Sequence, residues 1–195
     1  MEMILASASP RRARLLADLG LTFRIVPSAF NERHPKRPAE PARLAEALAL
    51  GKAREVADRL GSGLVIGADT IVILDGLILE KPENTEDAHQ MLRALSGKWH
   101  LVYTGIALVR AESADTRLSH ACTRVKFRDL TETEIEAYVN SGDPMDKAGA
   151  YGIQGLGAIL VEKIEGCYTN VVGLPLSRLV CMLRDWGIDP LEPWK

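Results

Sequence analysis

Residues 3–20 read MILASASPRRARLLADLG, an apolar run followed at once by the start of a helix. The run Met3–Ala6 has the composition of a short strand. Ser9 is a favoured N-cap residue, Pro10 is favoured at the first helical position, and Gly20 is a typical stop signal. This stretch therefore predicts a strand and a helix in immediate succession.

Three arginines, Arg11, Arg12 and Arg14, fall in the first turns of that helix. A helix N-terminus carries partial positive charge and unpaired N–H groups, so cations are unfavourable there unless an anion binds between them. A phosphate meets that requirement, and such a break in a local rule is typical of a functional site. The alternative is that the arginines are solvated and point away from the helix axis.

Length and composition place limits on the kind of protein. The chain has 195 residues, 47% of them apolar, which suits a single domain, 1–195, with a sizeable core. A formal net charge of −2 gives no overall attraction to nucleic acid or to an anionic membrane, so an anion site must be local. No stretch approaches the roughly 18 apolar residues of a membrane span, and the N-terminal apolar run is too short for a signal peptide. A cytoplasmic location is expected.

The cysteines and histidines do not suggest a metal site. The three cysteines are far apart and odd in number, which argues against a disulfide framework and a zinc site. The four histidines lack metal-ligand spacing. These residues are Cys122, Cys167, Cys181, His34, His89, His100 and His120.

The apolar patterns along the chain predict alternating strands and helices. They indicate strands at 23–26, 64–66, 99–109, 117–127 and 158–164, helices at 43–60, 85–95, 131–139 and 175–186, and a hairpin over 71–79. The polar segment 27–41 is too long for a plain connector, and 142–157 is rich in glycine. Because hairpins interrupt the alternation, we expect an α/β fold with a mixed sheet flanked by helices.

Asp69 is the first candidate for chemistry. It follows the apolar run 64–66 and the small residues Gly67 and Ala68, so we expect it where a buried strand ends, the usual place for active-site residues in open α/β sheets. A carboxylate there could hold a divalent cation or activate a water, and Thr70 beside it adds a hydroxyl. The alternative is an Asx-type turn that joins two strands.

Three lysines could add to a binding site. Lys52 lies in an alanine-rich predicted helix, Lys81 precedes a proline, and Lys147 lies in the glycine-rich stretch. Together with Arg11 and Arg12 they would form a cationic pocket suited to a polyphosphate. Taken singly, each is a solvated charge, and the sequence does not show whether they converge. The chain has neither a Walker A loop nor a G-x-G-x-x-G fingerprint, so the common nucleotide-binding folds are not supported.

Four motifs in order identify a resemblance. They are SASPRR at 7–12, GADT at 67–70, EKP at 80–82 and DKAGAYGIQG at 146–155. With these motifs the chain resembles the Maf family of nucleoside triphosphate pyrophosphatases over nearly its whole length. It looks most like the dTTP/UTP pyrophosphatase branch. The last motif continues with AYGIQ, whereas the version of this motif in the 7-methyl-GTP branch contains a serine and a glutamate.

The resemblance implies a fold similar to that of the inosine triphosphate pyrophosphatases, with an elongated mixed sheet and two lobes around a central cleft. It implies hydrolysis of nucleoside triphosphates, dTTP, UTP and modified pyrimidine nucleotides foremost, to the monophosphate and pyrophosphate. A Mg²⁺ or Mn²⁺ cofactor and a homodimer are implied as well. No nucleic-acid or membrane partner is expected.

The resemblance also assigns roles to residues. Asp69 matches the proposed proton acceptor and metal contact, and Glu32 matches a second metal residue. The matching substrate-binding positions are Ser7, Arg11, Arg12, Lys52, Thr70, Lys81 and Gln154. Among these, Arg12, Thr70 and Gln154 match positions that set specificity. Trp99 departs from the family's familiar pattern.

Two other functions stay open at this point. One is a pyrophosphatase for 7-methyl-GTP or another modified nucleotide. The other is a nucleotide-binding regulator of cell division or septum formation with little turnover, which the same pocket would serve. An RNA-binding role is disfavoured, since only 5% of the residues are aromatic and no basic stripe is interleaved with them.

Overall fold

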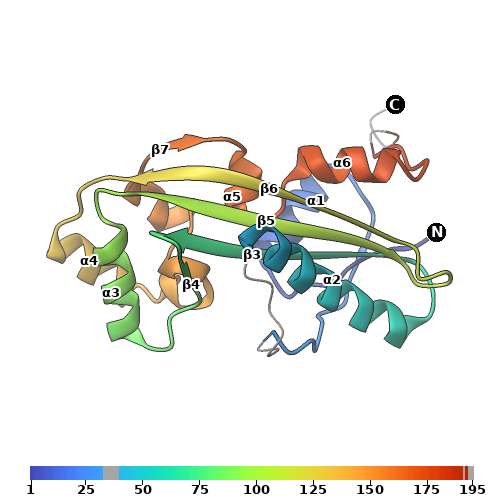
Figure 1. Cartoon of the computed structure of the whole chain (residues 1–195), viewed down its shortest axis with the longest axis horizontal. Helices are drawn as coiled ribbons and strands as arrows, with labels where there is room; N and C mark the ends of the chain where they lie inside the picture. The colour runs from blue at the N-terminus through green and yellow to red at the C-terminus, as the bar shows by residue number, and fades with distance from the viewer. Residues whose placement is uncertain (33–39, 191, 193–195) are drawn as a thin grey trace. The chain divides into compact units, whose positions relative to one another are not determined.

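The computed structural model describes residues 1–32, 40–190 and 192 (Figure 1). The strands are β1 (Met3–Leu5), β2 (Arg24–Ile25), β3 (Leu64–Leu74), β4 (Leu77–Leu79), β5 (Trp99–Arg110), β6 (Thr116–Phe127) and β7 (Val161–Glu165). The α-helices are α1 (Pro10–Asp18), α2 (Pro41–Leu60), α3 (Thr85–Leu95), α4 (Glu132–Asn140), α5 (Tyr168–Val172) and α6 (Leu176–Arg184). The 3₁₀ helices are η1 (Asp143–Asp146), η2 (Ala148–Ala150) and η3 (Gly155–Leu160). Part of the predicted 27–41 loop, including His34, lies outside the described residues.

Within the described residues, seven strands form one sheet in the order β2-β1-β3-β5-β6-β7, with β4 paired to β3. Strand β1 runs parallel to both β2 and β3, whereas β4 is antiparallel to β3 and β7 is antiparallel to β6. The sheet is therefore mixed, as the alternation of elements and hairpins predicted. The α/β class with flanking helices is confirmed.

The contacts between residues divide the chain into two compact units. The first unit consists of Met1–Asp69, Thr104–Ala121 and Gly173–Lys195, and the second of Thr70–Tyr103 and Cys122–Val172. Each contains a buried apolar cluster. In the first unit the cluster joins β1, α2, β3 and β5, and in the second it joins β3, α3, α4 and the glycine-rich stretch.

Two glycines bring helix α2 against the strands of the first unit. A Cβ added at Gly105 in β5 would lie 2.2 Å from the backbone carbon and oxygen of Ala45. A Cβ at Gly67 in β3 would lie 2.2 Å from the carbonyl oxygen of Ala49. Both distances are far below ordinary contact, so any side chain at either position would push the helix away from the sheet.

The close packing of α2 explains why one prediction was wrong. The run GADT was expected to end a strand or to form an Asx-type turn, but β3 continues through it from Leu64 to Leu74. Gly67 is needed for helix packing rather than for a turn. Asp69 consequently lies inside the strand and is 7% exposed.

Several local predictions are confirmed. The Ser9 Oγ accepts a hydrogen bond from the Arg12 N–H at the start of α1, as an N-cap does. Thr131 and Glu134 form the expected capping box of α4. The hairpin between β3 and β4 turns at Asp75 and Gly76, both with positive φ.

Other boundaries differ from the predictions. The expected strand over 158–164 begins only at Val161, because 155–160 form the 3₁₀ helix η3. The cap of α3 is Asn84, whose side chain accepts from the Asp87 N–H, and the predicted cap Thr85 is the first helical residue. Short α5 and the 3₁₀ turns of the glycine-rich stretch were not predicted.

A buried aromatic group anchors the glycine-rich stretch in the second unit. The His100 Nε2 lies 2.7 Å from the Tyr151 Oη, and both rings meet Phe127 edge to face. Burial lowers the pKa of His100 to about 4, and burial raises the pKa of Tyr151. Both side chains are therefore neutral at pH 7.

Within 1–32, 40–190 and 192, no helix has the length and apolar character needed to cross a membrane.

The packing of α2 predicts that Gly105→Ala destabilises the protein. The added methyl group must displace helix backbone, which costs about 1–3 kcal/mol of unfolding free energy. Urea denaturation measures the loss. Gly61→Ala serves as the comparison, because a Cβ at Gly61 meets nothing within 4 Å and tests only the cost of positive φ. An unchanged stability in Gly105→Ala would show that α2 is not held at this distance.

Neutral, buried His100 predicts a specific dependence of stability on pH. Its folded pKa, about 4, lies below its unfolded value of 6.5, so between these pH values only the unfolded chain takes up the proton. The stabilisation is complete above pH 6.5 and declines as the pH falls, by about 2 kcal/mol between pH 7 and pH 5 for this one group. Unfolding of the wild type and of His100→Asn at both pH values measures the difference. An imidazole NMR resonance of His100 that titrates near pH 6.5 would contradict the prediction.

Candidate functional site

The first unit brings Lys52, Asp69 and Glu32 together. The Lys52 Nζ on α2 lies 2.5 Å from the Asp69 Oδ1 on β3 and 2.7 Å from the Glu32 Oε1, which comes from the segment between β2 and α2. The side chains of Asp69 and Lys52 are 9% and 14% exposed, whereas that of Glu32 is 43% exposed. One ammonium group is thus shared by a buried and a half-exposed carboxylate.

The packing of α2 on β3 produces this contact. Gly67 and Asp69 lie two residues apart in one strand, so they face the same side of the sheet. A Cβ at Gly67 would lie 2.9 Å from the Cβ of Ala53, the neighbour of Lys52 in α2. The helix backbone is therefore close enough to the strand for Lys52 to reach Asp69.

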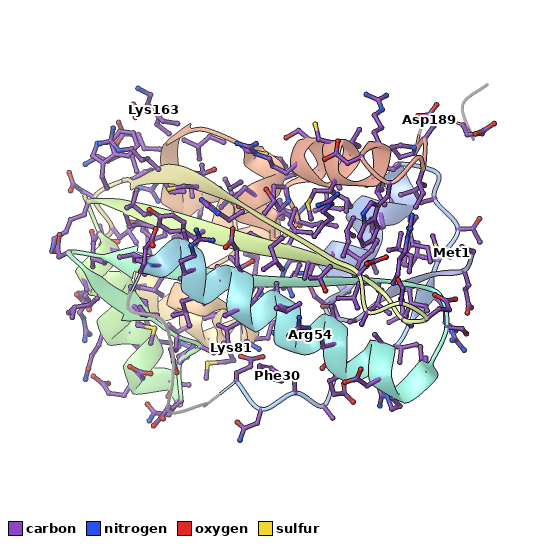
Figure 2. All side chains as sticks on the ribbon, turned by 45° about the vertical axis from the view of Figure 1, so that its right-hand side comes forward. Met1, Phe30, Arg54, Lys81, Lys163 and Asp189 are labelled. Atoms are coloured by element: carbon purple, nitrogen blue, oxygen red, sulfur yellow. The ribbon has the colours of Figure 1, made fainter. Side chains whose placement is uncertain are left out.

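Glu32 is brought to the site by the segment 27–32, which precedes α2 in the chain and runs along the side of this helix. The Pro27 carbonyl accepts from Arg59, and the Ala29 N–H donates to Glu55. The ring of Phe30 then covers Gly51, where a Cβ would lie 2.3 Å from it; Figure 2 marks Phe30 beside α2. Each step along the segment moves toward the N-terminal part of the helix. The sequence contained no signal for this arrangement.

Hydrogen bonds to other residues of the first unit hold the Arg12 side chain in place. Its Nε donates to the Gly173 carbonyl at 2.7 Å, just before α6, and its Nη1 donates to the Ser7 Oγ at 3.3 Å. Ser7 is buried and also accepts from the Ser9 N–H. By contrast Arg14 is exposed and pairs with Asp18, so the solvated alternative holds for this arginine.

Nearby carboxylates supply negative charge that offsets the unfavourable position of Arg12 at the N-terminus of α1. Burial lowers the pKa of Arg12, while the negative charge of Asp69 acts in the opposite direction. Arg11 lowers the pKa further, and Glu32 raises it. Arg12 therefore lies in the field of the two carboxylates that Lys52 also contacts. Part of the compensating negative charge comes from the chain itself.

The two carboxylates fit a hard divalent cation. Because the Asp69 and Glu32 oxygens contact the same nitrogen, they lie close to one another. Mg²⁺ is usually held by one or two carboxylates, with waters and substrate phosphates completing its coordination. The described residues contain no group of three or more His, Cys, Asp or Glu that could hold a metal. A cation here would therefore depend on phosphate or water ligands.

The remaining predicted residues, Thr70, Lys81 and Gln154, belong to the second unit. Thr70 follows Asp69 in β3, so their side chains point to opposite faces of the strand. Lys81 is exposed after β4 and is labelled in Figure 2. Gln154 is exposed at the N-cap position of η3, and its side chain makes no capping hydrogen bond.

The glycine-rich stretch that carries Gln154 is held by side chains that sequence reasoning did not identify. The Tyr138 hydroxyl donates to Asp143 at 2.6 Å and accepts from the Gly152 N–H. The Lys147 Nζ lies 2.7 Å from the Asp146 Oδ1 and also contacts Asp143. Lys147 is thus paired with two neighbouring carboxylates, as Lys52 is, and its contribution to a cationic pocket stays a prediction.

In the second unit, two cationic side chains lie over the ring of Trp99. The Arg124 guanidinium lies 4.5 Å from the centre of its ring, and the Lys163 Nζ lies 5.8 Å away. These residues come from the neighbouring strands β6 and β7, and Lys163 is marked in Figure 2. The cation–π contact gives Trp99 a packing role on the sheet.

One solved structure resembles the whole fold. The chain aligns with the structure of a HAM1 protein from Coxiella burnetii with a TM-score of 0.53, covering 95% of this chain and 99% of that one. The two sequences are 16% identical, so the likeness concerns the fold alone.

Curated relatives are much more similar in sequence. A dTTP/UTP pyrophosphatase of Moorella thermoacetica is 54% identical over 188 residues, covering 96% of each chain. A dTTP/UTP pyrophosphatase of Pelotomaculum thermopropionicum is 51% identical over 190 residues, covering 97% of this chain and 99% of the relative. The family model described as Maf-like protein matches residues 2–186. The resemblance inferred from the four motifs is confirmed, and the chain belongs to the Maf family.

Proposed function

We propose that this chain hydrolyses dTTP and UTP to the nucleoside monophosphate and pyrophosphate. The observation that carries the proposal is that relatives named for this activity are about half identical to it over nearly their full length. The arrangement of Asp69, Lys52 and Glu32 supports the proposal independently, because buried charges of both signs are costly to keep without a function.

The reaction makes defined demands on the site. A water must attack the α-phosphorus, the developing charge on the phosphate oxygens must be neutralised, and the leaving pyrophosphate must be held. Asp69 is proposed to orient the water and accept its proton. Mg²⁺ or Mn²⁺, held by Asp69 and Glu32, would supply charge neutralisation on the phosphate oxygens when bound.

The cationic side chains of the first unit suit the triphosphate. Arg11, Arg12 and Lys52 are proposed to bind phosphate oxygens, and the Ser7 hydroxyl would add a hydrogen-bond donor. The N-terminus of α1 adds backbone N–H groups, which favour anions for the same reason that they disfavour arginines. On the family resemblance, Lys81 is proposed as a further residue for the phosphate side of the substrate.

Base selection is proposed for Gln154 with Thr70 and Arg12. The Gln154 amide can donate to O4 and accept from N3–H of uracil or thymine in one plane. A flipped amide would suit cytosine, so discrimination against CTP requires neighbours that fix its orientation. The family resemblance extends the proposal to a single catalytic domain over 1–195 that acts as a cytoplasmic homodimer.

The catalytic role of Asp69 predicts that Asp69→Asn keeps the fold but loses turnover. The amide retains the shape of the side chain without its charge or basicity, so the rate should fall by about 10²-fold or more. Pyrophosphate release from UTP measures the rate, and thermal melting checks the fold. Asp75→Asn at the exposed hairpin is the matched control. Full turnover in Asp69→Asn would refute the assignment.

The role of Gln154 predicts a change in base preference. In Gln154→Glu the carboxylate cannot donate to O4, and an unpaired polar group in the bound complex costs roughly 1–3 kcal/mol, so kcat/KM for UTP and dTTP should fall roughly 5- to 150-fold. A guanine edge, with donors at N1 and N2, should lose less.

The measurement compares kcat/KM for UTP, dTTP, CTP and 7-methyl-GTP in the wild type, in Gln154→Glu and in a control, Gln90→Glu, at an exposed position of α3. An equal fall for all four nucleotides would show that Gln154 does not read the base. A wild type that prefers 7-methyl-GTP would instead favour the other branch of the family.

A further inference from the structure

The position of the Lys52 ammonium raises a question about the metal. Its nitrogen lies 2.5 Å from the Asp69 Oδ1 and 2.7 Å from the Glu32 Oε1. The ammonium group therefore occupies the space between the two carboxylates. A divalent cation held by these residues needs the same oxygens. Two cations at one point repel each other strongly, particularly where most of the surrounding water is excluded.

We infer that Lys52 is the internal counter-ion of the metal-free site and competes with the divalent cation for Asp69 and Glu32. The ammonium neutralises the carboxylates until metal binds, and is then displaced toward the substrate phosphates. This inference rests on the proposed function, and it assigns Lys52 two successive partners where the family resemblance assigns phosphate alone.

The surroundings of Lys52 favour movement of the side chain rather than of the helix. The backbone of α2 cannot shift inward, because it already lies against Gly67 and Gly105. The side chain has four rotatable methylene groups and three N–H donors that suit any nearby anion. Since it is only 14% exposed, a displaced ammonium would lose much of its compensation unless another anion accepted it.

Phosphate supplies that anion at the moment when the metal takes the carboxylates. Metal and phosphate should therefore bind cooperatively, and each should raise the affinity for the other by the same factor. Metal alone should bind weakly, because it must break the two contacts of Lys52 without replacing them. The arrangement thus restricts tight metal binding to the substrate-bound or product-bound protein.

The test measures binding of Mn²⁺ to the nucleotide-free protein by electron paramagnetic resonance of the unbound ion. In Lys52→Met the competitor is gone, and Mn²⁺ should bind about tenfold more tightly, in line with the loss of a hydrogen bond between charged groups. Lys52→Arg keeps the positive charge and should stay close to the wild type. Lys98→Met, which removes an exposed lysine paired with Asp75, is the matched control and should not change the affinity.

A second measurement uses inorganic pyrophosphate as the probe of coupling. In the wild type, pyrophosphate should strengthen Mn²⁺ binding both by its own oxygens and by giving Lys52 a new partner. In Lys52→Met only the first effect remains, so the factor by which pyrophosphate changes Mn²⁺ affinity should be smaller. If Lys52→Met does not fold, Lys52→Gln, whose amide still donates to one carboxylate, takes its place in both measurements.

The outcomes separate this inference from the proposed function. Unchanged or weaker Mn²⁺ binding in folded Lys52→Met or Lys52→Gln would overturn the competition, whatever the enzyme hydrolyses. Tighter binding in those variants would support it even if UTP and dTTP proved not to be substrates, because neither measurement requires turnover.

Discussion

The distance between α2 and the sheet governs the first unit. Gly67 and Gly105, on two strands, allow the helix backbone to approach to a distance that no other residue would permit. The alanines on the facing side of α2 complete the contact. A lysine from this helix can then reach a carboxylate in the middle of a strand, and a larger residue in either strand would separate the two charges. The chemistry of the site depends on this packing as much as on the charged residues themselves.

The charged side chains of the site form a shared cluster and not separate ion pairs. Lys52 is shared by Asp69 and Glu32, whose field also acts on Arg12. Such a cluster is costly to assemble away from water, because each ion loses hydration that its partners must replace. The compensation is a site that already holds both kinds of group required for phosphate chemistry, an acceptor for a water proton and donors for phosphate oxygens. Preorganised charges need little rearrangement when substrate binds.

The sequence predicted the fold class and most elements because capping residues, hairpin turns and apolar periodicity act over a few neighbouring residues. Ser9, Thr131 and the Asp75-Gly76 turn behave as their local chemistry requires. The continuous strand β3 was missed because a glycine can be present for close packing as well as for a turn. Only the packing of α2 against β3 shows that Gly67 serves close packing and not a turn.

The arrangement of the site also depends on packing between elements, which local sequence patterns do not reveal. Motifs selected Asp69 and Lys52 individually, but their contact depends on helix packing. The path of 27–32 along α2 brings Glu32 to Lys52 through Phe30 and Glu55, residues that carry no recognisable motif. The motif that contains Lys147 is rich in glycine, and only the structure shows that the charge of this lysine is paired with Asp143 and Asp146.

The discontinuous composition of the two units has a consequence for biosynthesis. The first unit begins at Met1 and is completed only by Gly173–Lys195. The hydrogen bond from Arg12 to the Gly173 carbonyl spans 161 residues. A chain emerging from the ribosome therefore cannot complete this unit until residues 173 and beyond have been made. Strand β1 and helix α1 must remain available while the intervening residues are synthesised, exposed to wrong partners for longer than the elements of a unit built from one continuous segment.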